Sequence, residues 1–156
     1  MRRKDREILE TEQIEKVIHS CHCCRIGFYD NGSIYIVPLN FGYEKNGEKR
    51  CFYFHGALTG RKIDLIQTGL PVGFEMDTNY QLNEAEHACG FSARFQSIVG
   101  AGNVSLIDTA SEKVHALKQI MCHNTGKDDW EFSAELLNKT SVFKLEVTEL
   151  SCKQHE

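Results

Sequence analysis

The chain contains little proline and tryptophan and has no long apolar run. Only two prolines and one tryptophan occur in 156 residues. No stretch of about 18 consecutive apolar residues is present, so neither a membrane-spanning helix nor a secretion signal is predicted. The formal net charge of −4 disfavours nucleic-acid binding, because domains that bind nucleic acid usually carry an excess of lysine and arginine.

Several motifs of common enzyme classes are absent as well. The chain has no G-x-G-x-x-G, G-x-x-x-x-G-K-[ST] or G-x-S-x-G sequence, which disfavours a dinucleotide-binding βαβ unit, a P-loop and a nucleophile elbow. The seven cysteines are an odd number without the spacing of a small secreted framework, so we expect reduced thiols and a cytoplasmic location. Residues 1–156 contain no repeat or low-complexity linker and are expected to form a single domain.

The chain does contain a series of strand-like segments joined by tight turns. Asn31-Gly32 and Asn46-Gly47 are strong hairpin signals. Two-residue turns join antiparallel strands, so a parallel doubly wound sheet is not expected. An antiparallel barrel, mainly β with peripheral helices, is the predicted fold class. Strands are expected over residues 25–30, 33–41, 50–55, 72–77, 91–107 and 142–150, and helices after Thr11, over 61–68, after Thr109 and around 130–137.

Two irregular positions refine this expectation. Pro38 has no backbone N–H to donate, so its strand is predicted to lie at a sheet edge or to carry a bulge. Gly100-Ala101-Gly102 interrupts the long strand 91–107, where glycines allow a bulge and a change of direction.

Arg61 and Lys62 begin a predicted helix, where two cations are unusual. The macrodipole already makes a helix N-terminus positive, so cations there cost stability. A bound phosphate would explain them, because free helix N–H groups and two basic side chains together form an anion site. A solvated Arg-Lys pair explains the sequence equally well.

His55 and Gly56 end the strand before this helix. Cys51, Tyr53 and His55 should share one face of the strand, opposite Phe52 and Phe54. His55 would then lie over a bound ring or substrate, with Gly56 allowing close approach of the backbone. A histidine that caps the strand or packs in the core is the simpler interpretation.

Other residues have weaker functional signals. The run Cys21-His22-Cys23-Cys24 resembles a metal cluster, but its spacing matches no standard zinc arrangement, and we predict no metal site. Cys89 would act as a redox thiol only if it were exposed or had a low pKa. Trp130 is expected to pack in the core, unless it reaches a ligand or a partner subunit.

Four segments taken together resemble one known family. They are MRRKDREI at the start, VPLNFGY at 37–43, YFHGALTGRK at 53–62 and FSARFQSIVGAG at 91–102. The chain is similar, over nearly its whole length, to the Nim proteins of nitroimidazole resistance, within the pyridoxamine phosphate oxidase-like flavin-binding group. The resemblance implies an antiparallel, Greek-key split β-barrel of the FMN-binding type that forms a homodimer, with flavin bound at the subunit interface.

The resemblance also implies roles for individual residues. Val37, Pro38, Leu39 and Asn40 would run along the edge of the isoalloxazine ring. Beside Gly56, the flavin phosphate would be held by Thr59, Arg61 and Lys62, and the reactive pocket would contain His55. Gln96 and Ser97 would approach the flavin from the long strand, across the dimer, and Trp130 would cover the ring from a partner subunit. The cysteine-rich run at 21–24 departs from the family pattern.

Three functions are compatible with these expectations. The first is a flavin-dependent reductase of a small aromatic or nitro-type acceptor, with NAD(P)H or a separate reductase as electron donor and His55 as catalytic residue. The second is a non-catalytic flavin carrier, since fold does not fix function. The third is a haem-binding protein with His55 or a histidine of the 19–22 region as axial ligand. FMN is the expected cofactor, with FAD and then haem as alternatives.

Overall fold

The computed structural model describes residues 4–155, so the first three residues of the opening motif lie outside the described part. The helices are η1 (Lys4–Arg6), α1 (Thr11–Ser20), α2 (Arg61–Gln67), η2 (Ala88–Gly90), α3 (Ala110–Thr125) and α4 (Ala134–Lys139). The strands are β1 (Glu7–Ile8), β2 (Cys24–Asp30), β3 (Ser33–Leu39), β4 (Gly42–Asn46), β5 (Lys49–Gly56), β6 (Val72–Asn83), β7 (Ser92–Leu106) and β8 (Ser141–His155). Within residues 4–155, no helix is long and apolar enough to cross a membrane.

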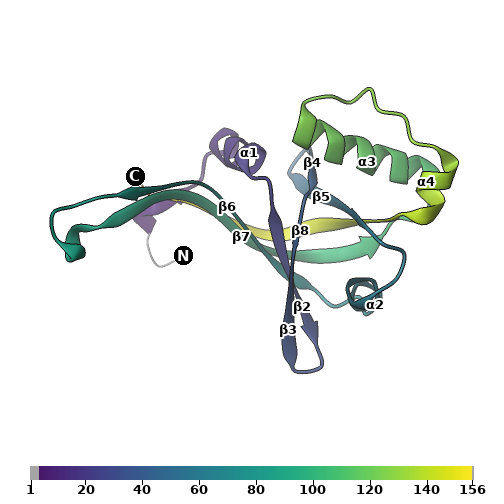
Figure 1. The fold of residues 1–156 in the computed structure, drawn as a ribbon, viewed down its shortest axis with the longest axis horizontal. Helices are drawn as coiled ribbons and strands as arrows, with labels where there is room; N and C mark the ends of the chain where they lie inside the picture. The colour runs from purple at the N-terminus through teal and green to yellow at the C-terminus, as the bar shows by residue number, and fades with distance from the viewer. Residues whose placement is uncertain (1–3, 156) are drawn as a thin grey trace.

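The strands form one antiparallel sheet in the order β3-β2-β6-β7-β8-β5-β4, and β1 pairs with β8. The predicted antiparallel, mainly β fold is therefore confirmed, and so is the edge position of Pro38 on β3. Between residues 4 and 155, no ladder joins β3 to β4, so the sheet is strongly bent but not closed. Figure 1 shows α3 and α4 over the β4–β5 end and a long projection of β6 and β7 on the opposite side.

The core lies on both sides of β5, as the alternation of its residues predicts. Phe52 and Phe54 are fully buried in the larger apolar cluster, inside the bend of the sheet. Tyr53 points the other way and packs with Ala116 and Leu117 of α3 in the smaller cluster. Burying one such aromatic side chain contributes about 1.5–3 kcal/mol, so these two clusters fix β5 between sheet and helix.

The long strands have two irregular positions, and the one in β7 has a steric cause. The β7–β8 register shifts between Ala101 and Gly102, which confirms the predicted bulge. A Cβ at Gly102 would lie 2.4 Å from the Glu146 carbonyl oxygen, so no larger residue fits there. A second shift, between Thr78 and Gln81 of β6, was not predicted and includes Asn79 at φ 55°.

Some predicted boundaries were wrong. β6 runs to Asn83 rather than to residue 77, and β8 runs to His155 rather than to residue 150. In both strands the added residues form a ladder with β7, which lies between them. The last helix begins at Ala134, since the Ser133 hydroxyl accepts a hydrogen bond from the Leu136 N–H and caps it there. The helix predicted after Thr109 does begin there: the Thr109 hydroxyl accepts a hydrogen bond from the Glu112 N–H and caps it.

Candidate functional site

One end of β5 meets the start of α2, and this junction brings predicted site residues together. The Lys62 ammonium turns back over the strand: a Cβ at Gly56 would lie 2.8 Å from Lys62 Nζ. The same ammonium lies 5.2 Å from the centre of the Phe143 ring. No carboxylate of the described residues pairs with Lys62, and partial burial lowers the pKa of its ammonium. A half-buried cation without a counter-ion is well suited to an anionic ligand.

Arg61 points in another direction, toward the β2–β3 hairpin. Its Nε and Nη2 lie 2.7 and 2.6 Å from Asp30 Oδ2, and its guanidinium lies 4.5 Å from the centre of the Tyr35 ring. The two neighbouring cations thus differ, because Arg61 already has a carboxylate partner and Lys62 does not. The sequence did not predict Asp30 as the partner of Arg61, because the two residues are 31 positions apart and no local pattern links them.

His55 lies beside the same junction. It pairs with Val142 of β8, and its exposed side chain shares the face of Tyr53, as expected from the alternation. Partial burial of the ring and the nearby positive charge of Lys62 both lower the pKa of His55. His55 is therefore neutral at pH 7, with one N–H to donate and one nitrogen lone pair to accept a hydrogen bond. Thr59 lies nearby in the chain, exposed in the segment 57–60.

The segment Val37–Asn40 forms the end of the edge strand β3. The Val37 and Leu39 side chains pack against the core, whereas Pro38 is exposed. Asn40 follows the strand and donates from Nδ2 to the His22 carbonyl oxygen at 3.3 Å. Edge strands present free backbone groups to a ligand or another chain, so this segment has the right kind of backbone for a ring edge.

The outer face of β2, β3, β6 and β7 is an open apolar surface. Ile34 and Ile36 are 65% and 62% exposed, and Val99 is 50% exposed. They surround a hollow of about 400 Å³ whose floor includes Gly27 and Gly73. We call this the open sheet face. Apolar patches of this kind on a soluble protein usually mark an interface.

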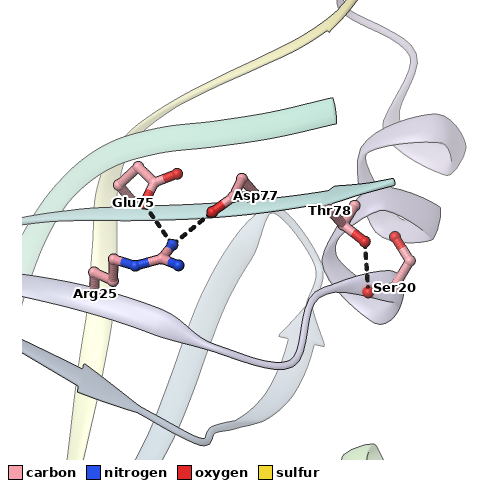
Figure 2. Close-up of polar contacts among 5 residues, drawn as sticks. All are labelled: Ser20, Arg25, Glu75, Asp77 and Thr78. Carbon is pink, nitrogen blue, oxygen red and sulfur yellow. Dashed lines mark hydrogen bonds and ion pairs between the residues drawn. The ribbon is translucent and has the colours of Figure 1, made fainter. Parts of the chain in front are cut away.

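Charged side chains border the open sheet face. Arg25 of β2 donates from Nη1 to Glu75 and Asp77 of β6, at 3.0 and 2.5 Å (Figure 2). Figure 2 also shows Thr78 of β6 donating to the Ser20 carbonyl oxygen, which fastens the end of α1 to the sheet. The Arg25 contacts tie β2 to β6 at the apolar hollow, and the Thr78 contact ties β6 to α1.

Gln96 and Ser97 lie far from Lys62 in the same chain. Gln96 pairs with Gln154 at one end of β8, whereas His55 pairs with Val142 at the other. The intervening residues of β8 correspond to about 40 Å of extended strand. Figure 1 shows the projection formed by β6 and β7, which we call the arm, running away from α2. One chain therefore does not join these two groups.

The arm has its own polar cluster. Gln96 accepts from Asn79 Nδ2 and donates to Gln154 Oε1, each at 2.7 Å. These residues line a hollow of about 250 Å³. Ser97 follows Gln96 in β7, so its hydroxyl lies on the opposite face of the sheet, where it is buried without a hydrogen-bond partner in the described residues. A buried hydroxyl and a fixed row of amides are the groups expected where a polar ligand or a second chain approaches.

Trp130 and the cysteines do not join the junction. Trp130 is 38% exposed in the irregular segment between α3 and α4, so the expectation that it packs in the core was wrong. Cys21 and Cys24 are buried, and burial raises the pKa of the Cys21 thiol to about 12. Among residues 4–155, no three His, Cys, Asp or Glu side chains are placed to hold a metal ion.

Comparisons with known proteins agree with this architecture. The family model described as pyridoxamine 5′-phosphate oxidase matches residues 10–154. A crystal structure of a candidate 5-nitroimidazole antibiotic resistance protein from Bacteroides thetaiotaomicron is 32% identical, with 95% of this chain and 86% of that chain covered and a TM-score of 0.81. No curated protein sequence matches the chain.

Two more distant structures share the fold. The flavocytochrome Anf3 from Azotobacter vinelandii is 20% identical, with 100% of this chain and 72% of that chain covered and a TM-score of 0.80. An FAD and haem binding protein from Mycobacterium smegmatis is 15% identical, with 97% and 74% covered and a TM-score of 0.79. The resemblance stated from the sequence motifs is thereby confirmed: this chain belongs to the pyridoxamine 5′-phosphate oxidase-like family, whose fold is the flavin-binding split barrel.

Proposed function

We propose that this chain binds FMN at the interface of a homodimer and acts as a flavin-dependent reductase of a small aromatic or nitro-type acceptor. The observation that carries the proposal is the junction of β5 and α2, where Lys62 lies half-buried over Gly56 without a counter-ion. The relative from Bacteroides thetaiotaomicron suggests the class of acceptor, since its description concerns resistance to a 5-nitroimidazole.

The residues present at the junction fit a phosphate-bearing ligand. The missing Cβ of Gly56 leaves room for the Lys62 ammonium, which can reach a phosphate oxygen from beside the strand. The first N–H groups of α2 have no partner within the helix, and the Thr59 hydroxyl lies just before them. Arg61 can contribute once it turns from Asp30, so Lys62 is the principal cation of the proposed phosphate site.

The ring of the flavin would lie along Val37–Asn40, against the open sheet face of a second copy. The face that includes Ile34 and Ile36 exposes apolar side chains to water in the single chain, and a second copy would cover it. The arm of the second copy would then supply Gln96 and Ser97, which one chain holds too far from Lys62. Each dimer would contain two such sites.

When bound, flavin supplies the redox chemistry, taking electrons from a pyridine nucleotide or a separate reductase and passing them to an acceptor. The residues of the chain bind and orient the ligands, and one of them can hold or accept a proton. His55 is neutral at pH 7 because burial and Lys62 lower its pKa, so its N–H can hold an acceptor oxygen in place. The same ring can accept a proton, but it is a poor proton source above pH 7.

The first test is the absorption spectrum of the purified protein, before and after addition of FMN and then anaerobically with NADH or NADPH. We expect a bound-flavin spectrum that bleaches with the pyridine nucleotide and recovers when a 5-nitroimidazole is added. Bound flavin that stays oxidised would instead indicate a carrier or an enzyme that needs a separate reductase. Absence of flavin binding would contradict the proposal, and a haem titration would follow.

His55→Ala separates binding from turnover. If His55 orients the acceptor, this variant keeps FMN and loses most of the acceptor-dependent reoxidation, by about 10²-fold as for a general acid–base or orienting group. Loss of FMN in the variant would make His55 a binding residue. His87→Ala, at an exposed histidine of the arm, is the control.

A further inference from the structure

Asn40 and Phe41 form the bend between β3 and β4, and the last turn of α3 packs against this bend. Asn124 Nδ2 donates to the Phe41 carbonyl oxygen at 3.0 Å and to the Ile120 carbonyl oxygen of its own helix at 2.7 Å. Asn124 Oδ1 makes a long contact, 3.5 Å, with Asn40 Nδ2. One amide group thus connects both neighbouring residues of the bend to α3.

The bend also touches α3 backbone to backbone. A Cβ at Gly42 would lie 2.4 Å from the Ile120 nitrogen and 2.5 Å from the Gln119 carbonyl carbon. Only glycine permits this approach. The bend therefore cannot move closer to α3, and the hydrogen bond from Asn124 resists movement away from it.

His123 completes the contact from the other side. Its ring centre lies 4.3 Å from that of Phe41, and its Nε2 donates to the Cys21 carbonyl oxygen at 2.8 Å. Because a carbonyl oxygen only accepts, Nε2 carries the hydrogen and the buried Nδ1 is the unprotonated nitrogen. The next carbonyl, of His22, accepts from Asn40. The cysteine-rich segment thus acts here through its backbone oxygens and not through its thiols.

The position of this bend matters because β3 is an edge strand. Val37 and Leu39 pair only with β2, and Asn40 and Phe41 lie outside the ladders. The end of β3 would be mobile without a support on its unpaired side. In an enzyme, misplacement of a bound group by about 1 Å can lower the reaction rate by about 10²-fold, so the place at which this backbone is held matters.

We infer that Asn124 is a positioning residue that sets the place of the Val37–Asn40 edge against the flavin ring. This inference rests on the proposed function. Asn124 itself touches the β3–β4 bend and its own helix, and acts on the ring only through the backbone of the bend. Its contribution is to hold the hydrogen-bonding groups of the strand end at one distance from the ring in both redox states.

The test compares Asn124→Ala with Thr125→Ala in the full chain. Thr125 is the matched control, because its hydroxyl donates at 2.7 Å to Met121 within α3 and its Oγ1 accepts from the Lys127 N–H, away from the bend. For each variant we would measure the Kd for FMN, the midpoint potential of bound FMN and the Tm. We expect Asn124→Ala to raise the Kd about tenfold and to shift the midpoint potential, with neither change in Thr125→Ala.

Asn124→Asp distinguishes hydrogen bonding from shape. It keeps the size of the side chain but sets a carboxylate oxygen against the Phe41 carbonyl, so we expect a Kd at least as high as that of Asn124→Ala. Asn124→Ser, which retains a short donor, replaces Asn124→Ala if that variant does not fold, with a smaller expected rise.

Three outcomes would overturn the inference. The first is an unchanged Kd and midpoint potential in Asn124→Ala, and the second is an equal change in Thr125→Ala. The third is full recovery of FMN binding in Asn124→Asp. If the unaltered chain does not bind FMN, the proposed function fails first and this inference with it, which is a different result from a variant that binds normally.

Discussion

The β5–α2 junction and the arm differ in how many of their predicted site residues lie together within one chain. At the junction, Gly56, Lys62 and Phe143 are already assembled by local sequence and by the β5–β8 ladder. In the arm, Gln96 is fixed by Asn79 and Gln154 but faces no other predicted site residue of its own chain. In the proposed site, one chain would therefore build the phosphate end and a second copy would complete the ring end.

The largest effect is expected from separating the two copies. Ile36→Glu places a charge in the middle of the open sheet face, where an interface would bury it at high cost. We expect a monomer by light scattering and loss of most FMN binding, with little change in monomer Tm because Ile36 is exposed in the single chain. Leu9→Glu, at a 76%-exposed residue away from this face, is the control. A dimer that persists in Ile36→Glu would place the interface elsewhere.

The next effect is at the phosphate end. Lys62→Ala removes the only cation of the junction that lacks a carboxylate partner in the described residues, and we expect the Kd for FMN to rise about 10–100-fold, as for loss of one charge-assisted contact. Arg61→Ala has a smaller expected effect, because Arg61 must first leave Asp30. Fluorescence titration with FMN measures both. An equal loss in the exposed control Lys127→Ala would contradict a specific role for Lys62.

The sequence predicted the parts of the fold that depend on short-range signals. Asn31-Gly32 makes the expected hairpin, with both residues at positive φ, and the helix expected after Thr109 begins there, capped by the Thr109 hydroxyl. The Asp30–Arg61 ion pair was not predictable in this way, since it depends on how the hairpin packs against α2. Electrostatic contacts between distant residues leave no periodic pattern in the sequence.

The distance between Lys62 and Gln96 could not be predicted from local sequence patterns either. Lys62 was singled out by its place at a helix start and by the family resemblance, whereas Gln96 came from the resemblance alone, which implied that it acts across the dimer. The distance between them follows from the length of β8, whose end was predicted five residues too early. Once β8 extends to His155, its far end and Gln96 belong to the arm. Strand length, set by pairing partners rather than by composition, therefore decided the layout of the proposed site.

Mixing two defective variants tests directly whether one site takes residues from two chains. Gln96→Ala alone should weaken FMN binding by a few-fold, through loss of one hydrogen-bonding group. In a heterodimer of Lys62→Ala and Gln96→Ala, one site would carry both defects and the other would carry none. We expect half of the sites to bind FMN with the unaltered Kd. If both residues belonged to the same chain's site, every site would carry one defect, and tagged co-purified heterodimers would show no site with the unaltered Kd.

The smallest expected effect is the pH dependence of stability that comes from His123, which packs against Phe41 in the bend between β3 and β4. Burial lowers the pKa of His123, and the charges of His19 and His22 lower it further, against the opposing hydrogen bond to Cys21. A base whose folded pKa is depressed stabilises the fold fully above its ordinary value of 6.5, and that stability is lost as the pH falls toward the folded value. The unaltered chain should therefore lose more unfolding free energy between pH 8 and pH 5.5 than His123→Asn does, in urea titrations at both pH values. Other groups titrate in both proteins and cancel in the difference. Equal losses would mean that His123 is protonated as easily in the folded chain as in the unfolded one, and that the contact of Phe41 with α3 does not depend on a neutral ring.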